Sequence, residues 1–180
     1  MDRHARSKHL RAQGHLSSEN SQRPFLLWLL VFLAWVLFMW GHSLVQGDAS
    51  SQESLAVVNI VRPLFELFNT TDIQVMTHVV RKCAHFLEYA VMGVLLRQTI
   101  ASCVRWRTGT AAGLDTWCSC AVWACVALLI PSLDETLQLF VPGRSGQITD
   151  VVLDFCGALA GLAVAHLWHA ARARRASRPA

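Results

Sequence analysis

Apolar residues gather in four long stretches of this chain, and polar residues fill the segments between them. Two stretches, Phe25 to Val45 and Trp117 to Leu133, contain no Asp, Glu, Lys or Arg. The other two, Ile73 to Leu96 and Asp150 to Trp168, are apolar overall but carry ionisable residues. Because a membrane-spanning helix needs about 20 predominantly apolar residues, the pattern predicts four spanning helices.

The composition agrees with a membrane protein. Hydrophobic residues make up 53% of the 180 residues and charged residues only 16%, which is too apolar for an ordinary soluble domain of this size. We therefore expect an all-α polytopic transmembrane bundle of four helices with short loops. Residues 1–24 and 170–180 are predicted to be basic tails on either side of a transmembrane domain that covers residues 25–169.

Positive side chains are distributed unevenly among the connecting segments. Five Lys and Arg residues precede the first predicted span, three follow the second and four follow the fourth, whereas the other two connections hold one each. Since Lys and Arg are enriched on the cytoplasmic side, both termini are predicted to be cytoplasmic. The net charge of +4 then reflects topology and contact of the tails with anionic inner-leaflet lipids, and it indicates no nucleic acid partner.

The ionisable residues within the predicted spans all fall toward the outer side in this topology. Helical spacing places Arg81, Lys82, His85, Glu88 and Tyr89 on or beside one face of the second span. The end of the third span, the following turn and the start of the fourth span add Asp134, Glu135, Gln138, Arg144, Asp150 and Asp154. The pattern predicts a polar pocket that opens outward between spans two, three and four.

Small residues support the same arrangement, because Gly157 and Gly161 share a face of the fourth span with Asp150 and Asp154. A Gly-x-x-x-Gly face lets the backbones of two helices approach closely in a membrane. We therefore expect the two carboxylates to face the inside of the bundle.

Carboxylates outnumber the cations in this predicted pocket. A charge left unpaired near the bilayer centre costs roughly 2.5–3.5 kcal/mol, so these groups must pair or reach water. The excess negative charge can be balanced by a shared proton, a protonated His85 or a bound divalent cation, and the sequence leaves these three open. The candidate metal ligands are His85, Glu88, Asp134, Glu135 and Asp150, which suit zinc or a hard cation.

The stretch from Ser54 to Phe68 is apolar, too short to span and interrupted by Pro63. We expect two short amphipathic helices on the outer surface, which either cover the polar pocket or pack on the bundle as a hydrophobic loop. In the first span, the stripe of Trp28, Phe32, Trp35 and Met39 is typical of packing.

The six cysteines show no paired zinc spacing and are predicted to be small buried side chains. Cys118 and Cys120 are close enough in sequence to suggest a redox pair, but they lie near the predicted cytoplasmic end, where thiols stay reduced.

Two segments resemble the VanZ family of bacterial membrane proteins: RKCAHFLEYAVMGVLL, from Arg81 to Leu96, and DETLQLFVPGRSGQITDVVLDFCGALAG, from Asp134 to Gly161. The segment from His42 to Ser54 is similar to the Ser-rich segment after the first span of the family. Asp154 stands where the family usually has Asn. The matching positions are Lys82, His85, Glu88, Tyr89, Asp134, Glu135, Gln138, Pro142, Gly143, Arg144, Asp150 and Gly157.

The resemblance implies a multi-pass protein of the bacterial cell membrane and a link to teicoplanin-type glycopeptide resistance. We expect the pocket to bind or modify an extracytoplasmic component of the envelope, such as a membrane lipid or a lipid-linked precursor. The candidate acids and bases are His85, Glu88, Asp134, Glu135 and Asp150, and the candidate substrate contacts are Arg81, Lys82, Tyr89, Gln138, Arg144 and Asp154.

Two other functions remain open at this point. The cluster could serve a small proton- or ion-coupled transporter, in which case four spans favour an oligomer. It could also fix helix packing in a membrane scaffold without catalytic activity. The sequence does not decide whether the protein is an enzyme.

Overall fold

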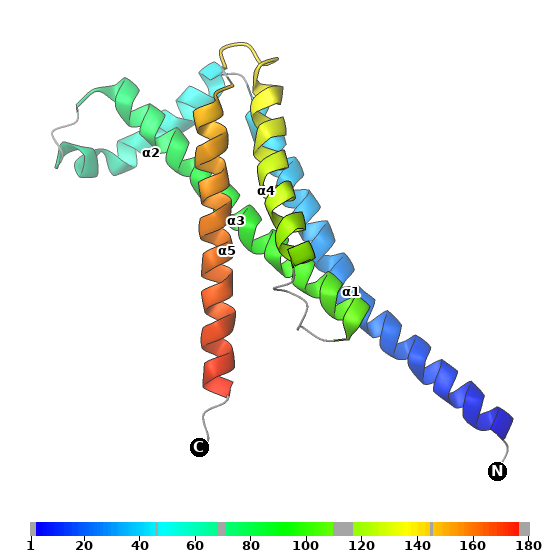
Figure 1. Cartoon of the computed structure of the whole chain (residues 1–180). Helices are drawn as coiled ribbons and strands as arrows, with labels where there is room; N and C mark the ends of the chain where they lie inside the picture. Colours follow the sequence, from blue (N-terminus) through cyan, green and yellow to red (C-terminus); the bar gives the residue numbers. More distant parts are fainter. Residues whose placement is uncertain (1–2, 46, 68–70, 110–116, 145, 177–180) are drawn as a thin grey trace.

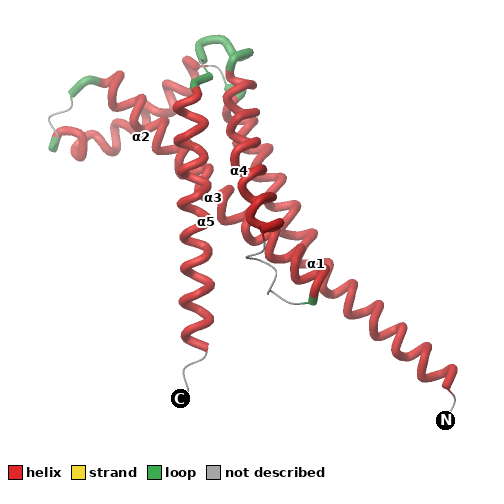
Figure 2. Tube along the Cα trace, viewed as in Figure 1, coloured by secondary structure: helices red, strands yellow, loops and turns green. Residues whose placement is uncertain are grey.

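The computed structural model describes residues 3–45, 47–67, 71–109, 117–144 and 146–176. These residues form five α-helices and no strand (Figure 2). The start of the first helix and the end of the last lie at one end of the bundle, and the connection between the last two helices lies at the other (Figure 1). The helices are α1 (Arg3–Ser43), α2 (Gly47–Glu66), α3 (Ile73–Thr108), α4 (Trp117–Gln138) and α5 (Ile148–Ala176).

Three of the described helices contain segments long and apolar enough to cross a membrane, namely Gln22–Ser43, Cys118–Gln138 and Ile148–Arg172. Large apolar side chains on these segments point away from the bundle, as the exposed fractions of Leu30 (65%) and Val164 (63%) show. Such broad apolar exposure is unfavourable in water but natural in lipid. The chain is therefore a multi-pass membrane protein.

Helix α3 occupies the place of the remaining predicted span, but it is more polar than the other three. Its length of 36 residues is more than enough to cross a bilayer. Arg81, Lys82 and Glu88 lower its hydropathy, so the prediction of four apolar spans holds in part, with three apolar segments and this polar helix among them. Helix α3 packs along both α1 and α5 and is the centre of the fold.

Close contact between α3 and α5 depends on glycine. A Cβ atom added at Gly161 would overlap the backbone carbonyl of Ala90, and one added at Gly157 would approach that of Phe86 within 2.5 Å. On the facing helix, Gly93 meets the backbone of Ala158 in the same way. The predicted small-residue face of α5 is confirmed, and it brings the first half of α5 against the first half of α3.

The apolar core joins α1, α3, α4 and α5. The predicted packing stripe of α1 is confirmed, because Phe32 and Met39 are buried in this core and the indole of Trp35 donates a hydrogen bond of 3.0 Å to the backbone carbonyl of Glu88. The buried core residues are Phe32, Val36, Met39, Tyr89, Met92, Leu96, Trp123, Ala127, Ile130 and Ala158.

Two helix boundaries differ from the sequence-based expectation. Helix α2 is a single helix from Gly47 to Glu66, so the prediction of two short pieces is wrong; Pro63 lies in its last turn, so the hydrogen bond that it removes and any kink affect only the end of the helix. Helix α3 continues past Leu96 to Thr108, and its arginines lie on the helix instead of in a loop. It begins at the N-cap Asp72 and ends at Gly109, whose φ of 71° suits glycine.

The cysteines also differ from the prediction. Cys83, Cys118, Cys120, Cys125 and Cys156 are exposed, Cys103 is partly exposed, and all six are free. The prediction of buried side chains is wrong because a small apolar side chain is equally at home against lipid and against protein. No disulfide joins Cys118 to Cys120.

Candidate functional site

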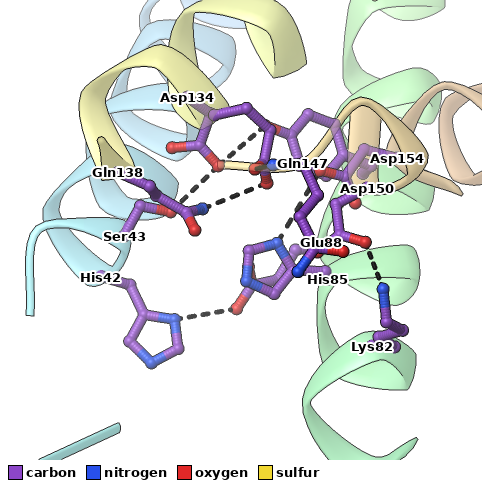
Figure 3. Close-up of polar contacts among 12 residues, drawn as sticks. His42, Ser43, Lys82, His85, Glu88, Asp134, Gln138, Gln147, Asp150 and Asp154 are labelled. Atoms are coloured by element: carbon purple, nitrogen blue, oxygen red, sulfur yellow. Dashed lines mark hydrogen bonds and ion pairs between the residues drawn. The ribbon is translucent and has the colours of Figure 1, made fainter. Parts of the chain in front are cut away.

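Polar side chains from α1, α3, α4 and α5 meet at the end of the bundle where the α4–α5 connection lies (Figure 3). Helix α1 ends here, α4 ends here and α5 begins here, so three helix termini surround the first half of α3. The convergence predicted for spans two, three and four is present, and α1 contributes to it as well.

Asp134 lies at the centre of this cluster and is 1% exposed. One carboxylate oxygen, Oδ2, accepts hydrogen bonds from the Ser43 hydroxyl at 2.9 Å and the Tyr89 hydroxyl at 3.1 Å. The other oxygen, Oδ1, is buried and has no hydrogen-bond partner in the described part of the chain. Two donors therefore orient the carboxylate and leave one oxygen unsatisfied.

Asp154 is fully buried on α5 and faces His85 of α3. Its Oδ2 lies 3.8 Å from Nδ1 of His85, beyond ordinary hydrogen-bond distance. Among the described residues neither oxygen of Asp154 has a hydrogen-bond partner. Burial of a carboxylate without hydrogen-bond donors costs free energy. A proton or a cation bound to Asp154 would lower this cost.

His85, Asp134 and Asp154 each offer a ligand atom, and these atoms lie within 4.8 Å of one another. Divalent cations bind imidazole and carboxylate ligands at about 2.0–2.6 Å. Small side-chain rotations would bring the three groups around one ion. The arrangement is a candidate metal-binding group. Asp154 belongs to it, although the sequence analysis did not name this residue among the candidate metal ligands.

A polar pocket of about 50 Å³ adjoins this group. The volume suits an ion with water or one small polar group, and it is far below the roughly 300–1,000 Å³ of pockets that enclose a drug-sized ligand. A larger molecule can place only a small polar part here. The lining residues are Arg81, Lys82, His85, Glu135, Gln138, Gly143, Arg144, Gln147, Asp150, Leu153 and Asp154.

The sequence also matches a family model, VanZ/LLP1, over residues 25–169. The chain belongs to the VanZ/LLP1 family. Comparison with curated proteins and with solved structures finds no match. The family is therefore shown by the sequence model, which confirms the resemblance carried by the two motif segments.

Three other carboxylates of this VanZ-family chain have partners of their own. Glu88 Oε1 lies 3.3 Å from Nδ1 of His42, and Lys82 forms an ion pair with Asp150. Glu135 accepts a hydrogen bond of 2.8 Å from the backbone N–H of Gln147. These contacts place Glu88, Glu135 and Asp150 outside the candidate metal-binding group.

Glu135 and Gln138 hold the connection between α4 and α5 in place. The Gln138 amide donates to Glu135 Oε1 at 3.3 Å. Glu135 Oε2 accepts from the backbone N–H of Gln147, the residue before the first turn of α5. Gly146 packs against the backbone carbonyl of Glu135 so closely that a Cβ atom would not fit. This acid fixes the position at which α5, and with it Asp154, enters the bundle.

Arg144 binds the end of α1. Its Nε donates to the carbonyl of Val45 at 3.0 Å, and a terminal nitrogen lies 3.4 Å from the carbonyl of His42. Burial and the nearby guanidinium of Arg81 lower the pKa of Arg144. Carbonyl groups at a helix C-terminus lack intrahelical partners, and an arginine satisfies them, so Arg144 ties the α4–α5 connection to α1.

Sequence reasoning missed His42 and Ser43. Both lie in the last turn of α1, at the depth of the other polar groups, and the family resemblance of the segment that starts at His42 was the available signal. Tyr89, by contrast, was named as a substrate contact and is fully buried behind Asp134. Its hydroxyl supports the carboxylate from inside the bundle.

Proposed function

We propose that this VanZ-family protein holds a divalent cation between His85, Asp134 and Asp154, and that this centre and the adjoining pocket bind the polar head group of an extracytoplasmic envelope component in a bacterial cell membrane. The observation that carries the proposal is the set of three buried carboxylate oxygens without hydrogen-bond partners in the described chain. Their position within reach of His85 supports a shared cation.

Charge balance favours a bound cation over a shared proton or a protonated His85. A single shared proton satisfies only two of the three oxygens, and a protonated His85 that rotated into hydrogen-bond distance of Asp154 Oδ2 would still leave Asp154 Oδ1 without a donor. A cation interacts with all three ligands at once. An imidazole and two carboxylates suit zinc or manganese and leave coordination positions open for water or substrate.

The rest of the cluster orients these ligands. Ser43 and Tyr89 hold Asp134, as groups around a metal ligand commonly do. Arg81 and Lys82 line the adjoining pocket and bring positive charge to it, which suits a phosphate or carboxylate of the bound molecule. A bound cation would polarise an oxygen of that head group.

A role of this kind, with both termini in the cytoplasm, could reduce sensitivity to teicoplanin-type glycopeptides, because these drugs act on the outer face of the membrane. Binding alone or modification of the envelope component would each have this effect. Transport of protons or ions and a scaffolding role are the outcomes that the experiments below separate from it.

The metal centre is tested with purified protein. We expect wild-type protein to bind Zn²⁺ or Mn²⁺ in calorimetry and to unfold at higher temperature when the ion is present, since an ion at about 100 times its Kd stabilises by about 2.7 kcal/mol. Asp154→Asn should abolish both effects. Without metal the variant should be at least as stable as wild type, because a buried unpaired charge is removed.

Asp72→Asn is the matched control. Asp72 is the exposed N-cap of α3, and Asn caps a helix as well as Asp does. This variant should retain the metal effects of wild type. Equal metal-induced stabilisation of wild type and Asp154→Asn would contradict the proposed centre.

The cellular role is tested in a teicoplanin-sensitive bacterium that expresses the protein. If expression raises the inhibitory concentration, His85→Ala should return it to the level of the empty vector, and His78→Ala, at an exposed position on the same helix, should not. Immunoblots of membranes establish equal insertion. An unchanged concentration with His85→Ala would rule the pocket out of the phenotype.

The same strains separate binding, catalysis and transport. New or lost envelope lipids and wall fragments in expressing cells would indicate catalysis, and their absence would favour binding. Proton flux into vesicles that contain the protein would indicate transport and contradict the proposal.

A further inference from the structure

A second cavity, of about 620 Å³, lies between α3, α4 and α5 toward the opposite end of the bundle from the polar cluster. It is bounded by the later part of α3, the start of α4 and the later part of α5, so none of its lining residues belongs to the metal-binding group. We call it the apolar cleft. It is lined by Arg97, Ile100, Ser119, Cys120, Trp123, Leu159, Leu162, Ala163, His166 and Leu167.

The volume and lining of the apolar cleft are those of a ligand site. Pockets of roughly 300–1,000 Å³ with mostly apolar walls and a few polar groups are typical of bound small molecules. The cleft is open to the surroundings of the bundle, since its lining residues Leu159 and Leu167 are 41% and 67% exposed. In a membrane, the component at hand to fill such a space is an acyl chain.

Trp123 supplies a second, independent sign of a ligand. This side chain is 6% exposed, lines the cleft and packs beside Phe155, with ring centroids 6.4 Å apart. Its indole N–H is buried and has no acceptor in the described part of the chain. Tryptophan N–H groups usually find a partner when buried, and a small rotation of the indole toward the cleft would let an oxygen of a bound molecule accept this hydrogen bond.

Among the described residues, the charged side chains around the apolar cleft are positive. Arg97 and His166 line it, and Arg105 and Arg172 lie farther along α3 and α5 at the same end. The helical segments at this end, residues 89–108, 117–133 and 155–176, contain no Asp or Glu. A basic pocket between membrane helices is suited to an anionic lipid head group.

We propose that the apolar cleft binds an anionic phospholipid, with an acyl chain along Trp123, Leu159 and Leu162 and the phosphate beside Arg97 and His166. Once the Trp123 indole rotates toward the cleft, an ester or phosphate oxygen accepts its N–H hydrogen bond. This site is independent of the metal centre, because the two share no residue.

The test uses full-length protein in nanodiscs that contain equal amounts of phosphatidylglycerol and phosphatidylcholine, with retained lipid identified by native mass spectrometry. Wild type should retain phosphatidylglycerol in preference to phosphatidylcholine by about fivefold, the effect of one basic residue near a net anionic lipid, because both lipids carry a phosphate but phosphatidylcholine also carries a cation that the basic cleft repels. Ala163→Trp fills the cleft and should abolish retention of both lipids. Val164→Trp, on the next residue, which is 63% exposed and outside the cleft, should behave as wild type.

A second variant tests the head group without filling the cleft. Arg97→Gln should remove the preference for phosphatidylglycerol while phosphatidylcholine is still retained, and Arg107→Gln, at an exposed position outside the cleft, should keep the preference. Equal lipid retention by Ala163→Trp and Val164→Trp would overturn the proposal, as would wild type without a preference. If wild type forms dimers and Ala163→Trp dissociates them, a second copy of the chain and not a lipid occupies the cleft, and the proposal is overturned.

Discussion

Asp134 and Asp154 are both buried carboxylates, but they differ in their hydrogen-bond partners. Asp134 receives two hydroxyl donors, while Asp154 faces only an imidazole at 3.8 Å. The difference follows from position, because Asp134 lies beside the Ser43 hydroxyl of α1 and the Tyr89 hydroxyl of α3, whereas Asp154 on α5 lies beside His85. An Asn at the Asp154 position would carry no charge into this place.

Removal of the Ser43 hydroxyl tests how Asp134 is held. Ser43→Ala leaves the Tyr89 hydroxyl as the remaining described donor to Oδ2 and should destabilise the protein by about 1–3 kcal/mol, the cost of a buried acceptor that loses a partner. Thermal unfolding in detergent measures the change. Ser132→Ala, whose hydroxyl donates to the Leu128 carbonyl of its own helix, is the control and should have little effect.

If the proposed metal centre is correct, Ser43→Ala should also weaken metal binding by about 10- to 100-fold, as changes to groups that orient a metal ligand do. A variant with normal stability and unchanged metal affinity would show that Ser43 does not position Asp134.

At the scale of whole helices, contact between α3 and α5 decides whether the site can form. His85 and Asp154 lie on these two helices, and the close approach at Gly157, Gly161 and Gly93 places them opposite each other. A wider spacing would separate the imidazole from the carboxylate.

Gly161→Ala is expected to force α3 and α5 apart. Its Cβ atom would overlap the carbonyl of Ala90, and overpacking of this kind typically costs about 1–3 kcal/mol. The melting temperature should fall. Gly41→Ala is a matched control, since a Cβ atom there meets nothing within 4 Å, and it should be neutral or stabilising because alanine favours helix. A melting temperature for Gly161→Ala at or above that of Gly41→Ala would contradict the packing argument.

The whole molecule combines a polar end and an apolar, positively charged end. The start of α1 and the end of α5 share one end of the bundle, and the α4–α5 connection lies at the other (Figure 1). The distribution of Lys and Arg predicts that the end with the termini is cytoplasmic, so the polar cluster should open outward.

Cysteine labelling tests this orientation in a chain whose six native cysteines are replaced. Ile148→Cys, at a position 85% exposed at the start of α5, should react with a membrane-impermeant maleimide in intact cells. Arg107→Cys, near the end of α3, should react only after the membrane is permeabilised. The reverse pattern would place the polar cluster on the cytoplasmic side.

Much of the fold could be predicted from residue type and spacing. The apolar runs of α1, α4 and α5, the glycine face of α5 and the shared depth of the ionisable residues all follow from local patterns. The course of α2 could not, because a proline near a helix end either breaks the helix or is tolerated, according to what the rest of the helix packs against.

The partners within the site depended on the tertiary structure. Arg144 lies near several acidic residues in the sequence, which suggests an ion pair. In the structure it instead binds two backbone carbonyls at the end of α1. His42 and Ser43 come from a helix that sequence reasoning left out of the pocket. A rotation of one helix by a single residue, about 100°, would change each of these partners.

The sequence by itself determined that this is a helical membrane protein of the VanZ/LLP1 family with an acidic polar cluster at one end. Such features depend on the length of apolar runs, because a backbone in lipid must satisfy its own hydrogen bonds. Only the tertiary structure decided which carboxylates are paired and which remain without donors. That choice depends on the rotation and spacing of four helices, which distant contacts such as Gly161 against Ala90 impose.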